Sequence, residues 1–568
     1  MPNAMKALPE RTADMMEWTW SEYAVYYDEL TRRGLTGATV ERYLADWTRL
    51  HDRVDEVGSR LAVAKDANTA DKDAEARFNR YIENVYPRMQ EAEQRLKARL
   101  LGSGLKPAGF ELPLRKMQAE AAIYRDANLP LSVEQQKLNT EYSKIVGNQT
   151  VQWEGKELTV TQLRPVCFET NRERREAAWR LASRRQLADR KAINDLWQRY
   201  LKLRLQLAGN AGFGDYRSYR WQELLRFDYT PENSKQFQQA IEAAVVPAAT
   251  RVYERRRRQL GLKTLRPWDL DVDPLGRAAL APFKTIERFK SGVHAMLTRV
   301  DAGLGGYFRT MMDEKLLDLD NRKNKAPGGY CTSFEAAQRP FIFMNAVGLH
   351  GDVMTLVHEA GHACHSFAAS RLPYYQQRQV GLEFAEVASM GMELLASPYF
   401  GRDSGGFYSK DEAARAYADN LERDILFWPY MALVDAFQHW VYENPADAME
   451  PVNCDRKWTE LSDRFMPGVD WSGFEDELAT GWHRKLHIHQ APLYYVEYGL
   501  AQLGACQVWA NALKDQAAAV TAYKDALALG GMKSLPELFS AAGARFAFDA
   551  DTLRTVVSLM EAKLGAEQ

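Results

Sequence analysis

Residues 352–365 of this chain read DVMTLVHEAGHACH and contain a His-Glu-x-x-His pattern. His358 and His362 are four residues apart, so on a helix they lie one above the other on the same face. Two imidazoles in this arrangement can reach one metal ion. Zinc binds histidine nitrogen at about 2.0–2.1 Å and prefers a tetrahedral shell. The residues between Asp352 and His358 are mostly apolar, so the stretch predicts a buried helix that binds one Zn²⁺ per chain.

Glu359 directly follows the first histidine, where its carboxylate can hold a water molecule beside the metal. Zinc lowers the pKa of such a water, and the carboxylate takes its proton as the water attacks a carbonyl carbon. We therefore predict that Glu359 is the general base of a hydrolytic reaction. Asp352 is the expected helix N-cap, because aspartate accepts hydrogen bonds from the first free N–H groups of a helix.

His365 is a competing candidate ligand in the same stretch. It is seven residues from His358, which corresponds to about 10 Å along a helix, so these two cannot easily share one ion. A pair of His362 and His365 is geometrically possible, but it leaves Glu359 without a role. The metzincin arrangement needs a third histidine at the position of Ala368, which excludes that class.

A third protein ligand is needed, because two histidines alone leave a zinc site too open. Residues 381–395 read GLEFAEVASMGMELL, which predicts a second helix with three glutamates. Glu386 and Glu393 are seven residues apart and share a face, whereas Glu383 projects from the neighbouring stripe. Spacing alone does not choose among the three.

The composition limits the classes of function. The formal net charge is −2, from 74 basic and 76 acidic side chains, which argues against nucleic acid or a membrane surface as partner. We expect no membrane span, because no apolar run reaches about 18 residues. The five cysteines form no CxxC pair, which indicates reduced thiols and predicts a cytoplasmic protein. No GxxxxGK[ST] loop is present, so we expect no nucleotide.

Helical periodicity dominates the chain and predicts a mainly α fold. Four long helices are expected, at residues 73–101, 172–207, 234–260 and 411–442. Strand patterns are few: alternation in residues 150–160 around Glu154-Gly155 predicts a β-hairpin, and residues 339–345 predict a strand. We divide the chain near residue 165, into an N-terminal helical region (1–165) that ends in the hairpin and a helical catalytic region (166–568).

Two consecutive motifs resemble those of a known family. The HEAGHxxH pattern of residues 358–365, followed by FAEVAS at 384–389, resembles the thimet oligopeptidase and oligoendopeptidase F family of zinc metallopeptidases. The resemblance implies that Glu386 is the third zinc ligand. It also implies a helical zincin with two lobes around a deep channel, a small β-sheet beside the zinc helix, and short unfolded peptides as substrates.

A third segment, residues 482–504, resembles the bacterial oligoendopeptidase F and Pz-peptidase branch of this family. The resemblance implies that His487, Tyr494 and Tyr498 bind substrate and stabilise the oxyanion at the zinc. A tyrosine hydroxyl suits this role, because it can donate a hydrogen bond to an oxygen that gains charge. Their spacings of seven and four would put them on one helix face, although Pro492 interrupts that helix. His489 is the rival of His487.

These features together predict a cytoplasmic zinc oligoendopeptidase. The strand near 341–344 would be an edge on which an extended peptide adds backbone hydrogen bonds. The loops at 328–330 and 405–408 would face the substrate. One alternative is a zinc carboxypeptidase or dipeptidyl carboxypeptidase, which needs a cationic group for the substrate's terminal carboxylate. A second alternative is a helical binding protein without activity.

Overall fold

The structure is a computed structural model that describes residues 4–322, 324–326 and 328–566. It is mainly α-helical with two small sheets, which confirms the predicted fold class. The chain forms two compact units, each built from three separate segments. Unit 1 comprises residues 1–121, 280–417 and 504–546, and unit 2 comprises residues 122–279, 418–503 and 547–568. The division near residue 165 falls inside unit 2 and stays a prediction.

Unit 1 holds the predicted metal motif. Its α-helices are α1 (Trp20–Arg32), α2 (Val40–Ala67), α3 (Lys72–Asn84), α4 (Tyr86–Gly102), α13 (Ile286–Val300), α14 (Ala302–Asp313), α15 (His350–Ala369), α16 (Tyr375–Arg378), α17 (Leu382–Ala396), α24 (Gln516–Ala528) and α25 (Leu535–Ala541). Its 3-10 helices are η1 (Ala4–Ala7), η2 (Thr12–Met15), η6 (Ser397–Tyr399), η7 (Arg402–Ser404) and η9 (Gly530–Met532). Three helices continue from one unit into the other along the chain, namely α5 (Glu111–Ile123), α18 (Lys410–Glu443) and α23 (Val496–Ala512).

A three-stranded sheet in unit 1 supports the predicted metal helix. Its strands are β3 (Leu317–Asp320), β4 (Tyr330–Phe334) and β5 (Arg339–Ala346), in the order β3-β5-β4. The strand predicted at 339–345 is thus confirmed as β5, but its predicted edge position is wrong. β3 pairs with β5 in parallel and β4 pairs with it antiparallel, so β5 is the central strand. The free edge on the antiparallel side belongs to β4.

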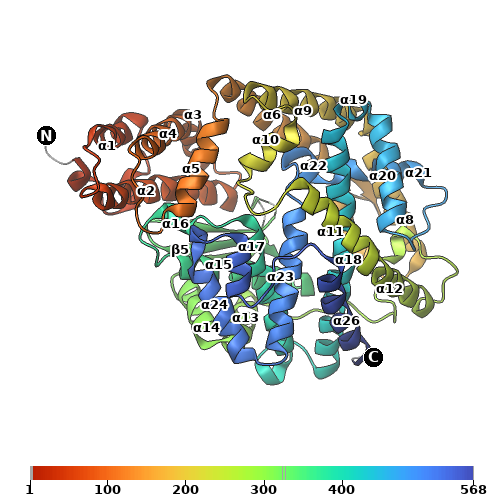
Figure 1. Cartoon of the computed structure of the whole chain (residues 1–568). Coiled ribbons are helices and arrows are strands. Elements are labelled where there is room, and N and C mark those ends of the chain that lie inside the picture. The colour runs from red at the N-terminus through yellow and green to blue at the C-terminus, as the bar shows by residue number, and fades with distance from the viewer. Residues whose placement is uncertain (1–3, 323, 327, 567–568) are drawn as a thin grey trace. The chain divides into compact units, whose positions relative to one another are not determined.

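Helix α15 packs against β5, β4, α14 and α24, and most extensively against α17 (Figure 1). Its inner residues are fully or nearly fully buried, as the apolar sequence predicts; they include Val353, Leu356, Val357 and Ala360. Asp352 is not the N-cap that we expected. The helix begins at His350, and the Asp352 carboxylate accepts hydrogen bonds from the backbone N–H groups of residues 347, 348 and 349. Those three N–H groups precede the helix, so the Asp352 carboxylate holds in place the segment that leads into α15.

Unit 2 is also helical. Its α-helices are α6 (Leu129–Gly147), α7 (Val160–Leu163), α8 (Arg172–Leu187), α9 (Arg190–Asn210), α10 (Tyr216–Glu223), α11 (Pro231–Ala244), α12 (Val246–Gln259), α19 (Pro445–Ala448), α20 (Pro451–Phe465), α21 (Glu475–Ala479), α22 (Leu486–Gln490) and α26 (Ala550–Ala566). Its 3-10 helices are η3 (Asp126–Asn128), η4 (Arg164–Phe168), η5 (Pro267–Asp269) and η8 (Thr480–Arg484). The predicted hairpin is confirmed as β1 (Thr150–Trp153) and β2 (Lys156–Thr159).

Three of the four predicted long helices are each divided in two. The first divides into α3 and α4 at Val85, the second into α8 and α9, and the third into α11 and α12 at Val245. Pro87 and Pro247 lie in the first turns of α4 and α12, where a missing N–H costs no hydrogen bond. The fourth prediction is confirmed as α18, which continues through Pro429.

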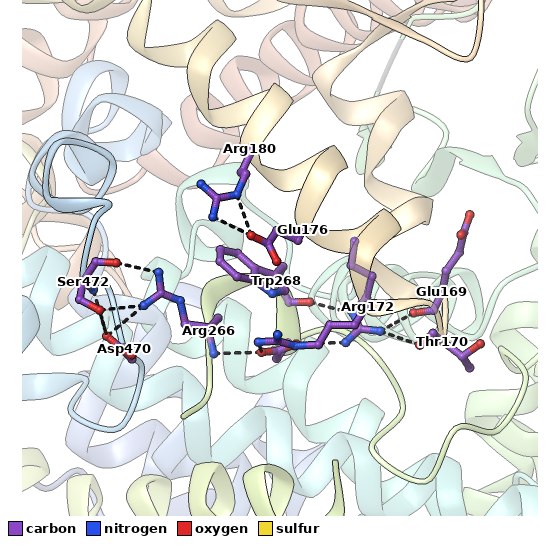
Figure 2. A network of polar contacts seen from close by, with 11 residues as sticks. Glu169, Thr170, Arg172, Glu176, Arg180, Arg266, Trp268, Asp470 and Ser472 are labelled. Atoms are coloured by element: carbon purple, nitrogen blue, oxygen red, sulfur yellow. Dashed lines mark hydrogen bonds and ion pairs between the residues drawn. The ribbon is translucent and has the colours of Figure 1, made fainter. Parts of the chain in front are cut away.

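A polar network fixes η5 to α8 in unit 2 (Figure 2). Arg172 and Arg175 both donate to the completely buried carboxylate of Asp269, at 2.8–3.0 Å. Arg175 also donates to the backbone carbonyl of Trp268, and Arg266 donates to Ser472. Each buried charge has an opposite charge or a carbonyl as partner, so the network holds η5 and α8 together.

Candidate metal centre

The predicted ligands His358 and His362 lie one turn apart on α15, with ring centroids 5.0 Å apart. The Glu386 carboxylate comes from α17: its Oε2 lies 3.4 Å from Nε2 of His358 and 3.8 Å from Nε2 of His362. One ligand atom from each residue lies within 4.8 Å of the other two. Within the part of the chain that the structure describes, this is the one group of three or more such side chains that meets this spacing. The two histidines and Glu386 are thus brought together.

Each candidate ligand has a partner behind it. Nδ1 of His358 lies 2.8 Å from Oε1 of Glu393 and donates its proton to that carboxylate, so Nε2 is the nitrogen that faces Glu386. The Ser389 hydroxyl donates to Oε2 of Glu386 at 3.1 Å. From the sequence, Glu393 is a rival ligand. In the structure, the Glu393 carboxylate instead lies where it can orient His358, a candidate metal ligand.

The electrostatics of the cluster favour a cation. Burial opposes a charge on His358, but Glu386 and Glu393 outweigh it and raise the pKa of His358 to about 10. Burial lowers the pKa of His362 to about 4. Glu386 is 7% exposed, and a buried carboxylate needs a positive partner. Two imidazole nitrogens and one carboxylate are a donor set of catalytic zinc sites, so these residues fit Zn²⁺.

Gly361 allows α17 to approach α15 closely. A Cβ atom at this position would lie 2.6 Å from both the Ala388 carbonyl oxygen and the Ser389 Cα. The same Ala388 carbonyl accepts a hydrogen bond from the Tyr523 hydroxyl, at 2.5 Å. The close approach at Gly361 puts the α17 backbone against α15, and the Tyr523 hydrogen bond joins that backbone to α24; Glu386 thereby comes within reach of the histidines. The glycine of the HExGH motif is a sequence signal for a close contact, but the sequence does not show that α17 is the helix that makes it.

Glu359, the predicted general base, lies beside the edge strand β4. It is 9% exposed, and its carboxylate lies near the backbone N–H of Cys331. Burial raises the pKa of Glu359. A base in a hydrolytic reaction benefits from a raised pKa, because its protonated form must then be stable enough to form. The sequence did not predict that Cys331 lies near Glu359.

The other candidate ligands do not join this group. His365 is 5% exposed, burial lowers its pKa to about 3, and its ring lies edge-on to Phe384 at 6.1 Å. Glu383 is buried near the start of α17 and supplies no atom to the cluster. Among the described residues, the geometry therefore favours Glu386 over both of its rivals on α17.

In unit 2, the rings of His487, Tyr494 and Tyr498 form one cluster. Tyr494 lies 5.8 Å from His487 and 5.2 Å from Tyr498, between ring centroids, and His487 lies 5.8 Å from Tyr498. The expected shared helix face is wrong. His487 is on α22 and Tyr498 on α23, and Tyr494 lies in the turn between them, where Leu493 has a φ of 59°. The turn at Pro492 therefore gathers the three rings.

His489, the rival of His487, is completely buried. Its ring is stacked on Tyr142 at 4.5 Å and lies 5.9 Å from Trp482. Burial lowers the pKa of His489 to about 3. His487 is partly exposed. Of the two, only His487 has a side chain that solvent can reach.

Comparison with known proteins places the chain in a family. The sequence pattern of peptidase family M3 matches residues 168–558. The oligopeptidase PepF of Bacillus subtilis is 26% identical over 253 residues, which are 43% of this chain and 36% of that protein. An oligoendopeptidase F homolog of Mycoplasma pneumoniae is 32% identical over 139 residues, 24% of this chain and 22% of that protein. The alignments thus span about a third or less of the length of these relatives.

Solved structures share the fold over almost the whole chain. A structure of Pz peptidase A with an inhibitor has a TM-score of 0.88 at 24% identity and covers 99% of both chains. The oligoendopeptidase F of Enterococcus faecium has a TM-score of 0.62 at 15% identity, with 98% of this chain and 99% of that chain covered. The family pattern covers well over half of the sequence, and the protein belongs to peptidase family M3.

Proposed function

We propose that the protein is a zinc-dependent oligoendopeptidase that hydrolyses internal bonds of short unfolded peptides. The observation that carries this proposal is the convergence of three donor atoms, from His358, His362 and Glu386, within 4.8 Å and next to Glu359. Membership of peptidase family M3 and the oligopeptidase names of the quoted relatives support it. The choice of zinc is supported by the donor set.

His358, His362 and Glu386 would hold the ion, with Glu393 and Ser389 orienting two of these ligands. When bound, zinc supplies Lewis acidity to the substrate carbonyl and lowers the pKa of a water molecule. The carboxylate of Glu359 takes the proton of the attacking water and then passes it to the leaving amine. The nearby backbone N–H of Cys331 favours the charged form of this carboxylate.

The edge of β4 would bind the peptide backbone. β4 pairs with β5 on one side, so the N–H and C=O groups on its other side can pair with an extended peptide. Cys331 lies in this strand near Glu359, which supports a general base beside that edge. An extended chain on this edge would present an internal bond, which is consistent with endopeptidase activity.

His487, Tyr494 and Tyr498 would bind the substrate and stabilise the oxyanion of the tetrahedral intermediate. Their mutual packing supports this role, because neutral hydroxyl groups held in a fixed cluster donate hydrogen bonds without reorganisation. The loops at 328–330 and 405–408 stay predicted substrate contacts, and the cytoplasmic location stays a prediction from the sequence. None of the described helices combines the length and apolarity needed to cross a membrane.

The carboxypeptidase alternative gains no support from the relatives quoted above, since none of them is described as one. A peptide with a blocked C-terminus separates the two activities. An endopeptidase cleaves it internally, whereas a carboxypeptidase or dipeptidyl carboxypeptidase leaves it intact.

A Glu359→Gln variant tests the proposed chemistry. Digestion of a mixed peptide library by the wild type, read by mass spectrometry, should give internal cleavages that a chelator abolishes. Glu359→Gln should keep one zinc per chain and lose about a thousandfold or more in rate, because general-base catalysis and the orientation of water are both removed. A wild type without hydrolysis would instead favour a binding protein.

A further inference from the structure

A cavity of about 200 Å³ opens beside His362 in unit 1. Its walls come from β4 and the turn after it, from the C-terminal half of α15, and from α16 and the segment leading to α17. Residues on these walls that matter for its chemistry are Glu335, Arg339, His362, His365, Ser366 and Arg378. Pockets for whole small-molecule ligands usually measure about 300–1,000 Å³. This cavity therefore has room for about one side chain.

The two arginines at the cavity have little capacity left for a ligand. Arg378 donates through Nη2 to both carboxylate oxygens of Asp52, at 2.7 and 2.8 Å, and its Nη1 lies 3.1 Å from Oε2 of Glu335. Arg339 binds both oxygens of Glu314, at 2.7 and 3.0 Å. Because paired guanidinium groups attract a further anion weakly, an acidic ligand is disfavoured here.

In contrast to the two arginines, Glu335 keeps capacity to bind a ligand. Its Oε2 accepts from Arg378, whereas no hydrogen bond to its Oε1 occurs among the described residues, and its side chain is 31% exposed. Asp52 and Asp55 lie behind it. Burial raises the pKa of Glu335, Arg378 lowers it, and these two aspartates raise it again. The cavity wall thus presents a carboxylate whose Oε1 can accept hydrogen bonds from a ligand.

Neutral polar groups complete the wall. The hydroxyls of Ser333 and Ser366 are hydrogen-bonded to each other at 3.0 Å, so one of them keeps acceptor capacity. His365 is 5% exposed, and within the described chain its Nε2 has no hydrogen-bond partner. Burial lowers its pKa to about 3, so the ring is neutral and does not repel a cation. The available groups therefore suit a ligand with several N–H donors.

We propose that this cavity is a substrate subsite for a basic side chain, arginine or lysine, with Glu335 as its counter-ion. His362 lies on the cavity wall and is a proposed metal ligand, so the basic residue would lie within about two positions of the cleaved bond. The subsite rests on the proposed peptidase function. It gives the peptidase a preference for a basic residue near the cleaved bond and leaves the hydrolytic chemistry unchanged.

The test compares matched peptides that carry arginine or citrulline, which has a similar shape and no charge, at each of the two positions on either side of the cleaved bond. At one position, wild-type kcat/KM should be about tenfold higher for arginine, as expected for one hydrogen bond to a charged group. Glu335→Gln should reduce this ratio to near one. Glu75→Gln is the control, because Glu75 is a partly exposed glutamate of unit 1 that pairs with Lys72 and does not line the cavity; it should keep the ratio.

Binding of the same fluorescent peptides to Glu359→Gln gives a second measurement that does not need turnover. Arginine peptides should bind about tenfold more tightly than citrulline peptides. Equal cleavage and equal binding at every position would overturn the subsite and leave the peptidase function intact. If the wild type hydrolyses no peptide, the proposed function fails, and the binding ratio still decides the subsite. Should Glu335→Gln not fold, the wild-type ratios decide it alone.

Discussion

Helices α15 and α18 each carry two possible metal-binding side chains four residues apart, and of these two pairs the one on α15 has the geometry of a metal site. His358 and His362 lie on α15 in unit 1, and Asp435 and His439 lie on α18 in unit 2. Both pairs are at least partly buried, and His439 comes within 3.6 Å of Asp435. Spacing along a helix is therefore the same in the two places. The difference lies in what the surrounding elements supply.

Neighbouring residues use only some of the polar atoms of the pair on α18: within the described chain, Oδ1 of Asp435 and Nε2 of His439 have no hydrogen-bond partner. Gln238 donates to Asp435 at 2.7 Å, and the nearby buried charges of Arg226 and Glu497 pair with each other at 2.6 Å. Burial and the charge of Arg217 lower the pKa of His439 to about 3, so it is neutral and forms no ion pair. The described residues supply no third donor close enough to complete a metal site here.

The pair on α15 receives a third donor from α17 and an orienting carboxylate, Glu393, behind His358. The comparison shows that the four-residue spacing of possible ligands identifies a candidate metal-binding helix. A second helix must come close to supply the third ligand and complete the site. That approach depends on Gly361, since any side chain there would meet the α17 backbone.

The largest predicted effect follows from removing the third donor. Glu386→Gln should lose bound zinc and reduce peptide hydrolysis by about a thousandfold, several kcal/mol of transition-state stabilisation, because the anionic ligand is gone. Elemental analysis and a cleavage assay measure the two losses. His439→Gln is the control and should keep both zinc and activity. If Glu386→Gln retains both, the third ligand is another residue.

The next effect is on stability and concerns α18. Burial raises the pKa of Asp435 to about 6, above the unfolded value near 4, so the folded state binds this proton more tightly. The resulting stability is present below about pH 4 and is lost as the pH rises to about 6. Asp435→Asn removes this loss. It should be more stable than wild type by about 3 kcal/mol at pH 7.5, and by clearly less at pH 4.5.

Unfolding midpoints of variant and wild type at the two pH values measure this difference. An Asp435→Asn variant that is less stable at pH 7.5, or that loses zinc, would show that the carboxylate holds a cation. In that case the contrast between the two helices would not hold.

A smaller effect is expected behind His358. Glu393→Gln should weaken zinc affinity by about ten- to a hundredfold, because a neutral amide orients the imidazole less well than a carboxylate. Titration against a competing chelator measures the affinity. Complete loss of zinc, equal to that in Glu386→Gln, would instead identify Glu393 as a direct ligand.

Much of the site could be predicted from local sequence. The α15 motif gives His358, Glu359 and His362, because a four-residue spacing has one geometric meaning on a helix. The choice between Glu386 and Glu393 could not be made in that way. Both lie on one face of α17, and the choice depends on a contact between α15 and α17 that local spacing does not encode. The resemblance to a family supplied Glu386, and the structure supplies its geometry.

The errors in the predicted helix bounds have a similar cause, because local sequence does not show where one helix ends and the next begins. Apolar periodicity continues across Val85 and Val245, so it does not reveal that new helices start there. Proline is no reliable marker either, since α18 continues through Pro429. Likewise, the apolar run of β5 indicates a buried strand, but its pairing on both sides depends on β3 and β4, which come from other parts of the chain.

Anomalous diffraction at the zinc edge, from crystals of the wild-type protein grown with zinc, would show where the metal binds. We predict one strong peak per chain, at about 2.0–2.2 Å from Nε2 of His358, Nε2 of His362 and a carboxylate oxygen of Glu386. A peak at Asp435 and His439 with none at α15, or no ordered zinc at all, would contradict this prediction.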